Sequence, residues 1–243
     1  MQRRALLAVS LLAFTSALAL TQHARAARET KAPPSGAVSY AALEQEVVSE
    51  INLARTRPAE YATYLEALRS MYAGKEFRRP GRPGLLTEEG TGALDEAVKF
   101  MRAARPLPAL AVSNGMCYGA RELVKEQAAS GATGHKGADG SFCEQRTGRF
   151  GAWREPIGEN LSYGDETARE RVLTLLIDDG FANRGHRQRL LGAAYKVVGV
   201  ACGDHKLGAL CVITLAGGFA EGPAATKTPT APKSAAPSGA RRF

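Results

Sequence analysis

The sequence predicts an α+β fold in which a small antiparallel sheet lies between layers of helices, a three-layer α–β–α sandwich. Two observations carry this prediction. Before residue 180, apolar residues recur every three or four positions, as they do on one face of an amphipathic helix. After residue 194, the segments 195–202 and 209–215 are continuous apolar runs rich in β-branched residues, which is typical of strands covered on both faces.

Capping residues and proline predict where the first helices begin. Ser39 is expected to cap the first helix, and Pro58 to end it and start the second. Thr87 is expected to cap a third helix that runs to Ala104. An exposed loop rich in proline, glycine and arginine, residues 78–84, would connect the second helix to the third.

The second half is expected to add two more major helices and a hairpin. Ser113 or Asn114 starts one helix, and Asp165 caps another that runs from Glu166 to Asp179. A short helix at 187–191 precedes the two strands, which residues 203–208 connect as a turn. A further short strand is expected at 159–163.

The N-terminal residues predict export. Two arginines precede an apolar run at 5–20, and residues 24–26 (ARA) provide a small-x-small cleavage site, so residues 1–26 are interpreted as a signal peptide. Cleavage after Ala19 and an uncleaved anchor remain alternatives. The run is too short for a stable membrane span. The protein is therefore expected to be secreted, either extracellular or periplasmic.

Composition predicts one domain between two unstructured segments. Residues 27–38 form a disordered linker, residues 39–220 the folded domain, and residues 221–243 a disordered basic tail rich in Ala, Pro and Ser. The formal net charge of +8 includes three charges in residues 1–26 and a net three in residues 221–243, which leaves about +2 for the domain. No nucleic-acid partner is expected from so small a basic excess.

Four cysteines in an exported protein favour disulfides over metal thiolates. Cys202 and Cys211 flank the predicted turn and could face each other across the hairpin, which would leave Cys117 to pair with Cys143. Free buried thiols are the alternative.

Three polar residues are the strongest candidates for chemistry. His135, Glu159 and His186 each lie next to a glycine, a residue that lets another chain segment approach closely. Two imidazoles and a carboxylate brought together would form a metal site or an acid/base cluster. Each also has a structural interpretation: a solvated loop histidine, a carboxylate paired with an arginine, and a histidine beside a helix cap.

The order and spacing of several short motifs resemble the bacterial branch of the secreted CAP superfamily (SCP, pathogenesis-related-1-like, cysteine-rich secretory proteins). The resemblance covers residues 40–219 and rests on these segments: residues 50–55 with Asn52 and Arg55, 134–135, 158–161, 185–187 and 198–200.

The resemblance implies an α–β–α sandwich with a central cleft that holds two histidines and two acidic residues, often with zinc or another divalent ion. His135, Glu159 and His186 match three members of this tetrad. The fourth is expected at Asp179, which continues the helical phase of the apolar residues before it, with Asp178 as the alternative.

The function implied is a secreted, non-catalytic binding module for a lipid, sterol or cell-envelope component, with a possible divalent-metal site in the cleft. The alternative is a secreted metal-dependent hydrolase, peptidase or esterase-like, with Glu159 as general base. No nucleophile elbow of the Gly-x-Ser-x-Gly type accompanies the histidines, which favours binding over catalysis.

Overall fold

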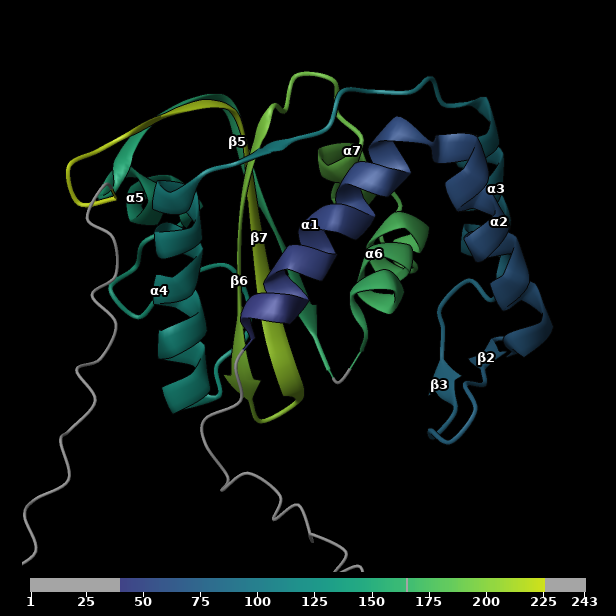
Figure 1. Cartoon of the computed structure of the whole chain (residues 1–243). Helices are drawn as coiled ribbons and strands as arrows, with labels where there is room; N and C mark the ends of the chain where they lie inside the picture. Colours follow the sequence, from purple (N-terminus) through teal and green to yellow (C-terminus); the bar gives the residue numbers. More distant parts are fainter. Residues whose placement is uncertain (1–39, 165, 226–243) are drawn as a thin grey trace, which may run out of the picture. The chain divides into compact units, whose positions relative to one another are not determined.

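A four-stranded sheet with helices on both faces organises residues 40–164 and 166–225, which the computed structural model describes (Figure 1). The predictions made for residues 1–39, Asp165 and residues 226–243 lie outside the described residues. They include the signal peptide, the linker, the Ser39 and Asp165 caps and most of the basic tail.

The sheet is built around the predicted hairpin. Its strand order is β4-β6-β7-β5, with bounds β4 Ala111–Val112, β5 Gly151–Tyr163, β6 Val197–His205 and β7 Gly208–Glu221. β6 and β7 are antiparallel, β5 is antiparallel to β7, and the two-residue β4 is parallel to β6. β5 is much longer than the short strand predicted at 159–163, because the charged residues and Pro156 in its first half obscure the strand pattern in the sequence.

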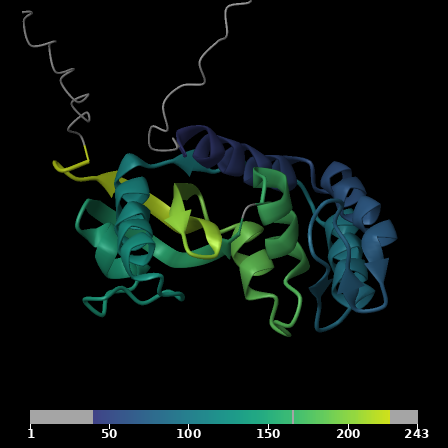
Figure 2. The ribbon, with the colours of Figure 1, turned by 90° about the horizontal axis from the view of Figure 1, so that it is seen from below.

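Successive side chains of β7 point to opposite faces of the sheet and belong to two separate hydrophobic clusters. Cys211, Ile213 and Leu215 belong to the larger cluster with helix α1 (Ala41–Thr56) and helix α6 (Ala168–Ile177). Leu210 and Val212 point to the other face and belong to the cluster that includes helix α4, Asn114–Ser130. Figure 2 shows α4 and α6 on opposite sides of the sheet. The predicted α–β–α sandwich is confirmed.

The remaining elements extend the two helical layers. Helix α2 (Pro58–Ala67) packs against α3 (Thr91–Ala103), and the two contribute Tyr61, Leu65, Leu94 and Met101 to the larger core cluster. The bounds of these elements are α2 Pro58–Ala67, the 3-10 helix η1 Leu68–Met71, α3 Thr91–Ala103, α5 Cys143–Gly148 and α7 Gly185–Leu190, together with a small sheet of β1 Tyr72–Ala73, β2 Glu76–Phe77 and β3 Leu85–Leu86.

Two predicted helix starts are confirmed. Pro58 is the first residue of α2. The Ser113 side chain accepts a hydrogen bond from the Met116 amide (3.2 Å) at the start of α4, which satisfies one of the amides left unpaired in a first helical turn.

Two predicted starts are wrong. α3 begins at Thr91 instead of directly after Thr87, because Thr87 Oγ1 donates to the Lys75 carbonyl and accepts from the Gly90 amide, which makes a turn. α6 begins at Ala168, where Thr167 and Glu170 form a capping box.

Of the two predicted disulfides, one is confirmed and the other is wrong. The Cys202–Cys211 disulfide is confirmed, between residues directly opposite each other in β6 and β7. The Cys117–Cys143 pair is wrong, since both thiols are free. Cys117 lines a cavity between α1 and α4, whereas Cys143 lines a different cavity beside His135. Burial raises the pKa of both thiols, that of Cys143 to about 12.

In the part of the chain that is described, no helix combines the length and the hydropathy needed to cross a membrane.

Candidate functional site

His135 and Glu159 form the first imidazole–carboxylate pair. His135 lies in the loop after α4 and its Nδ1 is 3.0 Å from Glu159 Oε1, at the centre of β5. The second carboxylate oxygen of Glu159 accepts a hydrogen bond from Arg146 Nη2 (2.7 Å), and the Arg146 side chain is fully buried. Arg146 Nη1 also donates to the His135 carbonyl, so a single arginine holds both members of the pair.

His186 and Asp178 form the second pair. His186 Nδ1 is 2.6 Å from Asp178 Oδ1, and the other carboxylate oxygen accepts hydrogen bonds from the His186 and Arg187 amides at the start of α7. Burial by itself would raise the pKa of Asp178, but the hydrogen bonds from His186 and the main chain lower it below its ordinary value. Asp178 is therefore an anion at neutral pH.

Asp178, the alternative for the fourth member, lies beside His186, whereas the predicted Asp179 does not. α6 ends at Ile177, and Asp178 has left-handed backbone angles (φ 56°, ψ 42°), so helical phase no longer applies beyond it. Asp179 turns to the other side and accepts hydrogen bonds from the Glu88 and Glu89 amides ahead of α3.

The two pairs are connected through Asn160. Its side chain is buried beside Glu159 on β5, and its Nδ2 donates to the His186 carbonyl (3.1 Å). Gly158 precedes them, and a Cβ atom there would lie 3.0 Å from Arg189 Nε and 3.2 Å from the Tyr195 hydroxyl. In the Gly-Glu-Asn segment, Gly158 lies close to Arg189, Glu159 provides the carboxylate for His135, and Asn160 connects the strand to the His186 main chain.

The described side chains do not by themselves complete a metal site. An ionised carboxylate only accepts hydrogen bonds, so each neutral ring carries its proton on Nδ1 and keeps the Nε2 lone pair free. Carboxylates that orient histidines in this way are typical around metal ions. Within residues 40–164 and 166–225, however, no group of three or more His, Cys, Asp or Glu side chains is placed to hold a metal ion. Two imidazoles are fewer protein ligands than structural zinc sites use.

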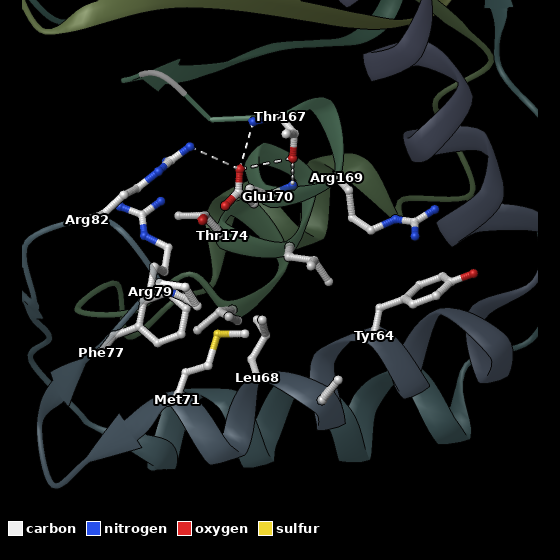
Figure 3. A pocket seen from close by; sticks show the side chains of 14 residues that line it. Tyr64, Leu68, Met71, Phe77, Arg79, Arg82, Thr167, Arg169, Glu170 and Thr174 are labelled. Atoms are coloured by element: carbon white, nitrogen blue, oxygen red, sulfur yellow. Dashed lines mark hydrogen bonds and ion pairs between the residues drawn. The ribbon is translucent and has the colours of Figure 1, made fainter. Parts of the chain in front are cut away.

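A separate groove lies on the far side of α6, with a cavity of about 550 Å³ (Figure 3). Its walls are mainly apolar and come from α2, η1, β2 and α6. The apolar side chains that line it are Tyr64, Ala67, Leu68, Met71, Phe77, Pro80, Leu173 and Ile177.

Arginines lie around the rim of this groove. Arg79 and Arg82 are at one end. Arg79 forms an ion pair with Glu166 (3.3 Å), and Arg82 forms one with Glu170 (3.6 Å). Arg169 is at the other end, stacked over the Tyr64 ring at 4.0 Å and paired with Glu50. No sequence motif indicated this groove, because its walls come from segments about a hundred residues apart.

Comparison with known proteins identifies the domain. Residues 95–214 match the model of the cysteine-rich secretory protein family, CAP. The chain contains a CAP domain. The resemblance found in the short motifs is thereby confirmed, and all four residues of the two imidazole–carboxylate pairs lie inside the matched region.

Two solved structures are similar to the chain. An extracellular protein containing an SCP domain from Bacillus anthracis is 18% identical with a TM-score of 0.37, and the match covers 49% of this chain and 37% of that protein. An outer surface protein from Borrelia burgdorferi is 16% identical with a TM-score of 0.39, covering 45% of this chain and 78% of that protein. The chain thus spans little more than a third of the Bacillus protein. No curated protein matches it in sequence.

The groove is only partly inside the matched CAP region. α6 lies within residues 95–214, but the opposite wall, from Tyr64 to Arg82, precedes it. The two pairs lie inside the matched region, whereas one wall of the groove lies before it.

Proposed function

We propose that this protein is an exported, non-catalytic CAP-domain binding module that takes up a lipid or sterol of the cell envelope in the groove between α2 and α6. The observation that carries the proposal is the groove itself. Its volume of about 550 Å³ and its mainly apolar walls suit an apolar ligand of moderate size. The arginine–glutamate pairs at its rim suit a polar end group that remains near solvent.

Export is supported by the chemistry of the cysteines. A disulfide such as Cys202–Cys211 persists in oxidising compartments, which agrees with a signal peptide at residues 1–26. We therefore propose that the domain acts outside the cytoplasm, where envelope lipids are accessible to it.

Filling the groove tests the proposed ligand. Ala67 is exposed and lines the groove, so Ala67→Trp should occupy the cavity without disturbing the core. Binding of a fluorescent long-chain fatty acid and of a fluorescent sterol, measured by titration, should weaken at least tenfold in this variant for whichever probe binds. Ala59→Trp, at an exposed position on the same helix outside the groove, is the matched control.

The proposal fails if neither probe binds the wild-type protein, or if Ala67→Trp and Ala59→Trp bind them equally well. Metal-dependent turnover of peptide or ester substrates that is lost in a His135→Ala, His186→Ala double variant would instead favour the hydrolase.

The zinc expected from the resemblance remains a prediction, and we propose that it is weak and exchangeable. His135 and His186 would hold it through Nε2, with Glu159 and Asp178 orienting the rings, and it would supply a Lewis acid for a polar ligand group. Titration calorimetry with zinc should give binding that the double histidine variant loses and that His205→Ala retains. Equal heats in the wild-type protein and the double variant would contradict the assignment.

A further inference from the structure

Two neighbouring leucines of the small sheet are largely exposed to solvent. Leu85 is 51% exposed and Leu86 is 78% exposed, and together they form strand β3. Among the described residues, no other large apolar side chains are exposed to this extent at adjacent positions. Contiguous apolar surface of this kind marks binding sites for membranes or for other proteins. We refer to Leu85 and Leu86 as the leucine pair.

The leucine pair lies directly beside the groove between α2 and α6. In the antiparallel pairing of β2 with β3, Leu85 is opposite Phe77, and Phe77 lines the groove. Residues paired in this way have Cα atoms only about 5 Å apart. The strand that carries the exposed leucines is therefore the immediate neighbour of a strand that forms part of the groove wall. Figure 1 shows this small sheet at the lower right, where it projects from the helices.

β3 is too short to bind a protein partner by strand addition. It has two residues, and Pro83 shortly before it has no amide hydrogen to donate. Just after β3, the Thr87 amide and hydroxyl both donate to the Lys75 carbonyl, so the main chain there is already paired. A strand of another protein would find few main-chain groups to pair with. A lipid bilayer needs none, because it takes up the side chains alone.

The charges around the leucine pair are largely balanced. Arg78 pairs with Glu76 inside the small sheet (2.6 Å), and the arginines at this end of the groove rim are paired with Glu166 and Glu170. A surface with exposed leucines and paired charges suits the boundary between headgroups and acyl chains better than a strongly anionic partner. The long apolar stem of Arg78 would let its charged end stay among the headgroups.

We propose that the protein docks on a lipid bilayer by inserting Leu85 and Leu86, which brings the groove to the membrane surface for lipid uptake. This inference rests on the proposed lipid function and deepens it, because it makes a bilayer the source of the ligand. Insertion of apolar side chains is not weakened by salt, unlike attraction between charges. The attachment is weak and reversible, since even a myristoyl chain binds a membrane only marginally.

Vesicle flotation with the full chain tests the docking. The protein should float with phosphatidylcholine vesicles at millimolar lipid, and the bound fraction should not fall in about 1 M salt, where the Debye length is about 3 Å. The double variant Leu85→Ser, Leu86→Ser should bind at least tenfold more weakly. The matched control is Val112→Ser, Leu207→Ser, which removes two comparably exposed side chains from the four-stranded sheet and its turn and should bind like wild type. Both double variants should keep the wild-type urea midpoint, because all four side chains are exposed.

An added tryptophan reports whether the leucine pair enters the bilayer. The wild-type chain contains a single tryptophan, Trp153, on β5. In Leu86→Trp, vesicles of lipid brominated in the acyl chains should quench the added fluorescence, whereas the emission of the wild-type protein should not change. Equal quenching of the two proteins, or quenching of neither, would contradict insertion.

Docking and ligand binding fail separately in these experiments. Ala67→Trp should lose the soluble fluorescent probe but keep vesicle binding, because it fills the groove and leaves the leucine pair in place. The leucine double variant should bind the soluble probe normally but take it from vesicles at least tenfold more slowly. Flotation that depends on the leucines in a protein that binds no probe would support docking and overturn the lipid groove.

Three outcomes overturn the docking itself. The wild-type protein does not float, the two double variants float equally, or high salt releases the protein from the vesicles. Self-association of the wild-type chain in sedimentation, lost in Leu85→Ser, Leu86→Ser, would also overturn it, because a second copy of the chain would then cover the leucine pair.

Discussion

At the scale of single residues, one backbone conformation decides which aspartate joins the candidate site. Asp178 has left-handed angles at the end of α6, and this places its carboxylate on His186 and on the first amides of α7. Aspartate and asparagine are among the few residues other than glycine that adopt this conformation readily. Asp178 therefore ends one helix and positions a histidine at the start of the next.

Replacing Asp178 with asparagine tests this double role. Asp178→Asn keeps the left-handed conformation but removes a buried anion that accepts several hydrogen bonds, so the free energy of unfolding at pH 7 should fall by about 2 kcal/mol. The pKa of Asp178 is lowered in the folded protein, so the stability it contributes is present above its unfolded pKa and is lost as the pH falls through the folded value.

The difference between wild type and Asp178→Asn should therefore narrow at acidic pH, as measured by urea denaturation across the pH range. Asp179→Asn is the control, since Asp179 does not contact His186. A constant difference between the two proteins down to pH 2 would contradict the assigned interaction.

At the scale of elements, the β6–β7 hairpin shows why one cysteine pair formed. Cys202 and Cys211 lie directly opposite each other in the ladder, at a pair that does not exchange main-chain hydrogen bonds, where strands approach most closely. Cys117 and Cys143 belong to α4 and α5 and face separate cavities. The prediction of a Cys117–Cys143 pair depends only on these being the two cysteines left over. It takes no account of the direction in which each side chain leaves its helix.

Thiol counting checks the pairing. The unfolded, non-reduced protein should react with two equivalents of a thiol reagent, contributed by Cys117 and Cys143. The double variant Cys202→Ala, Cys211→Ala should lower the free energy of unfolding by about 2.5 kcal/mol, as expected for a short closed loop. Detection of no free thiol would show that the remaining cysteines are also paired.

At the scale of the whole molecule, buried arginines hold distant segments together. Arg55 on α1 donates to the carbonyls of Pro108, Leu190, Gly192 and Tyr195, although it is only 2% exposed. Asn52 exchanges two hydrogen bonds with the main chain of Leu110. The first motif of the resemblance therefore has a structural role, because it satisfies the main chain of two loops.

Arg55→Lys should reveal this role. A lysine presents three donors from a single atom and cannot reach all four carbonyls, so the free energy of unfolding should fall by about 3 kcal/mol. Arg57→Lys, at an exposed position one residue beyond α1, should change little. Equal urea midpoints for the two variants would contradict a structural role for Arg55.

Much of the fold was predictable because its signals are local. The helical period around Leu94 and Leu123, the proline that separates α1 from α2, and the β-branched runs of the hairpin are all set by residues close together in the chain. Three of the four residues in the imidazole–carboxylate pairs were found in the same way, from glycines beside them.

The sequence by itself determined the sandwich and the hairpin disulfide, and it singled out His135, Glu159 and His186 as candidates. Only the tertiary structure decided that Asp178 completes the second pair, that Arg146 holds the first, and that Cys117 and Cys143 stay apart. The groove also arises only there. The physical reason is that each of these features is a contact between segments far apart in the chain, and the periodicity of neighbouring residues carries no information about such contacts.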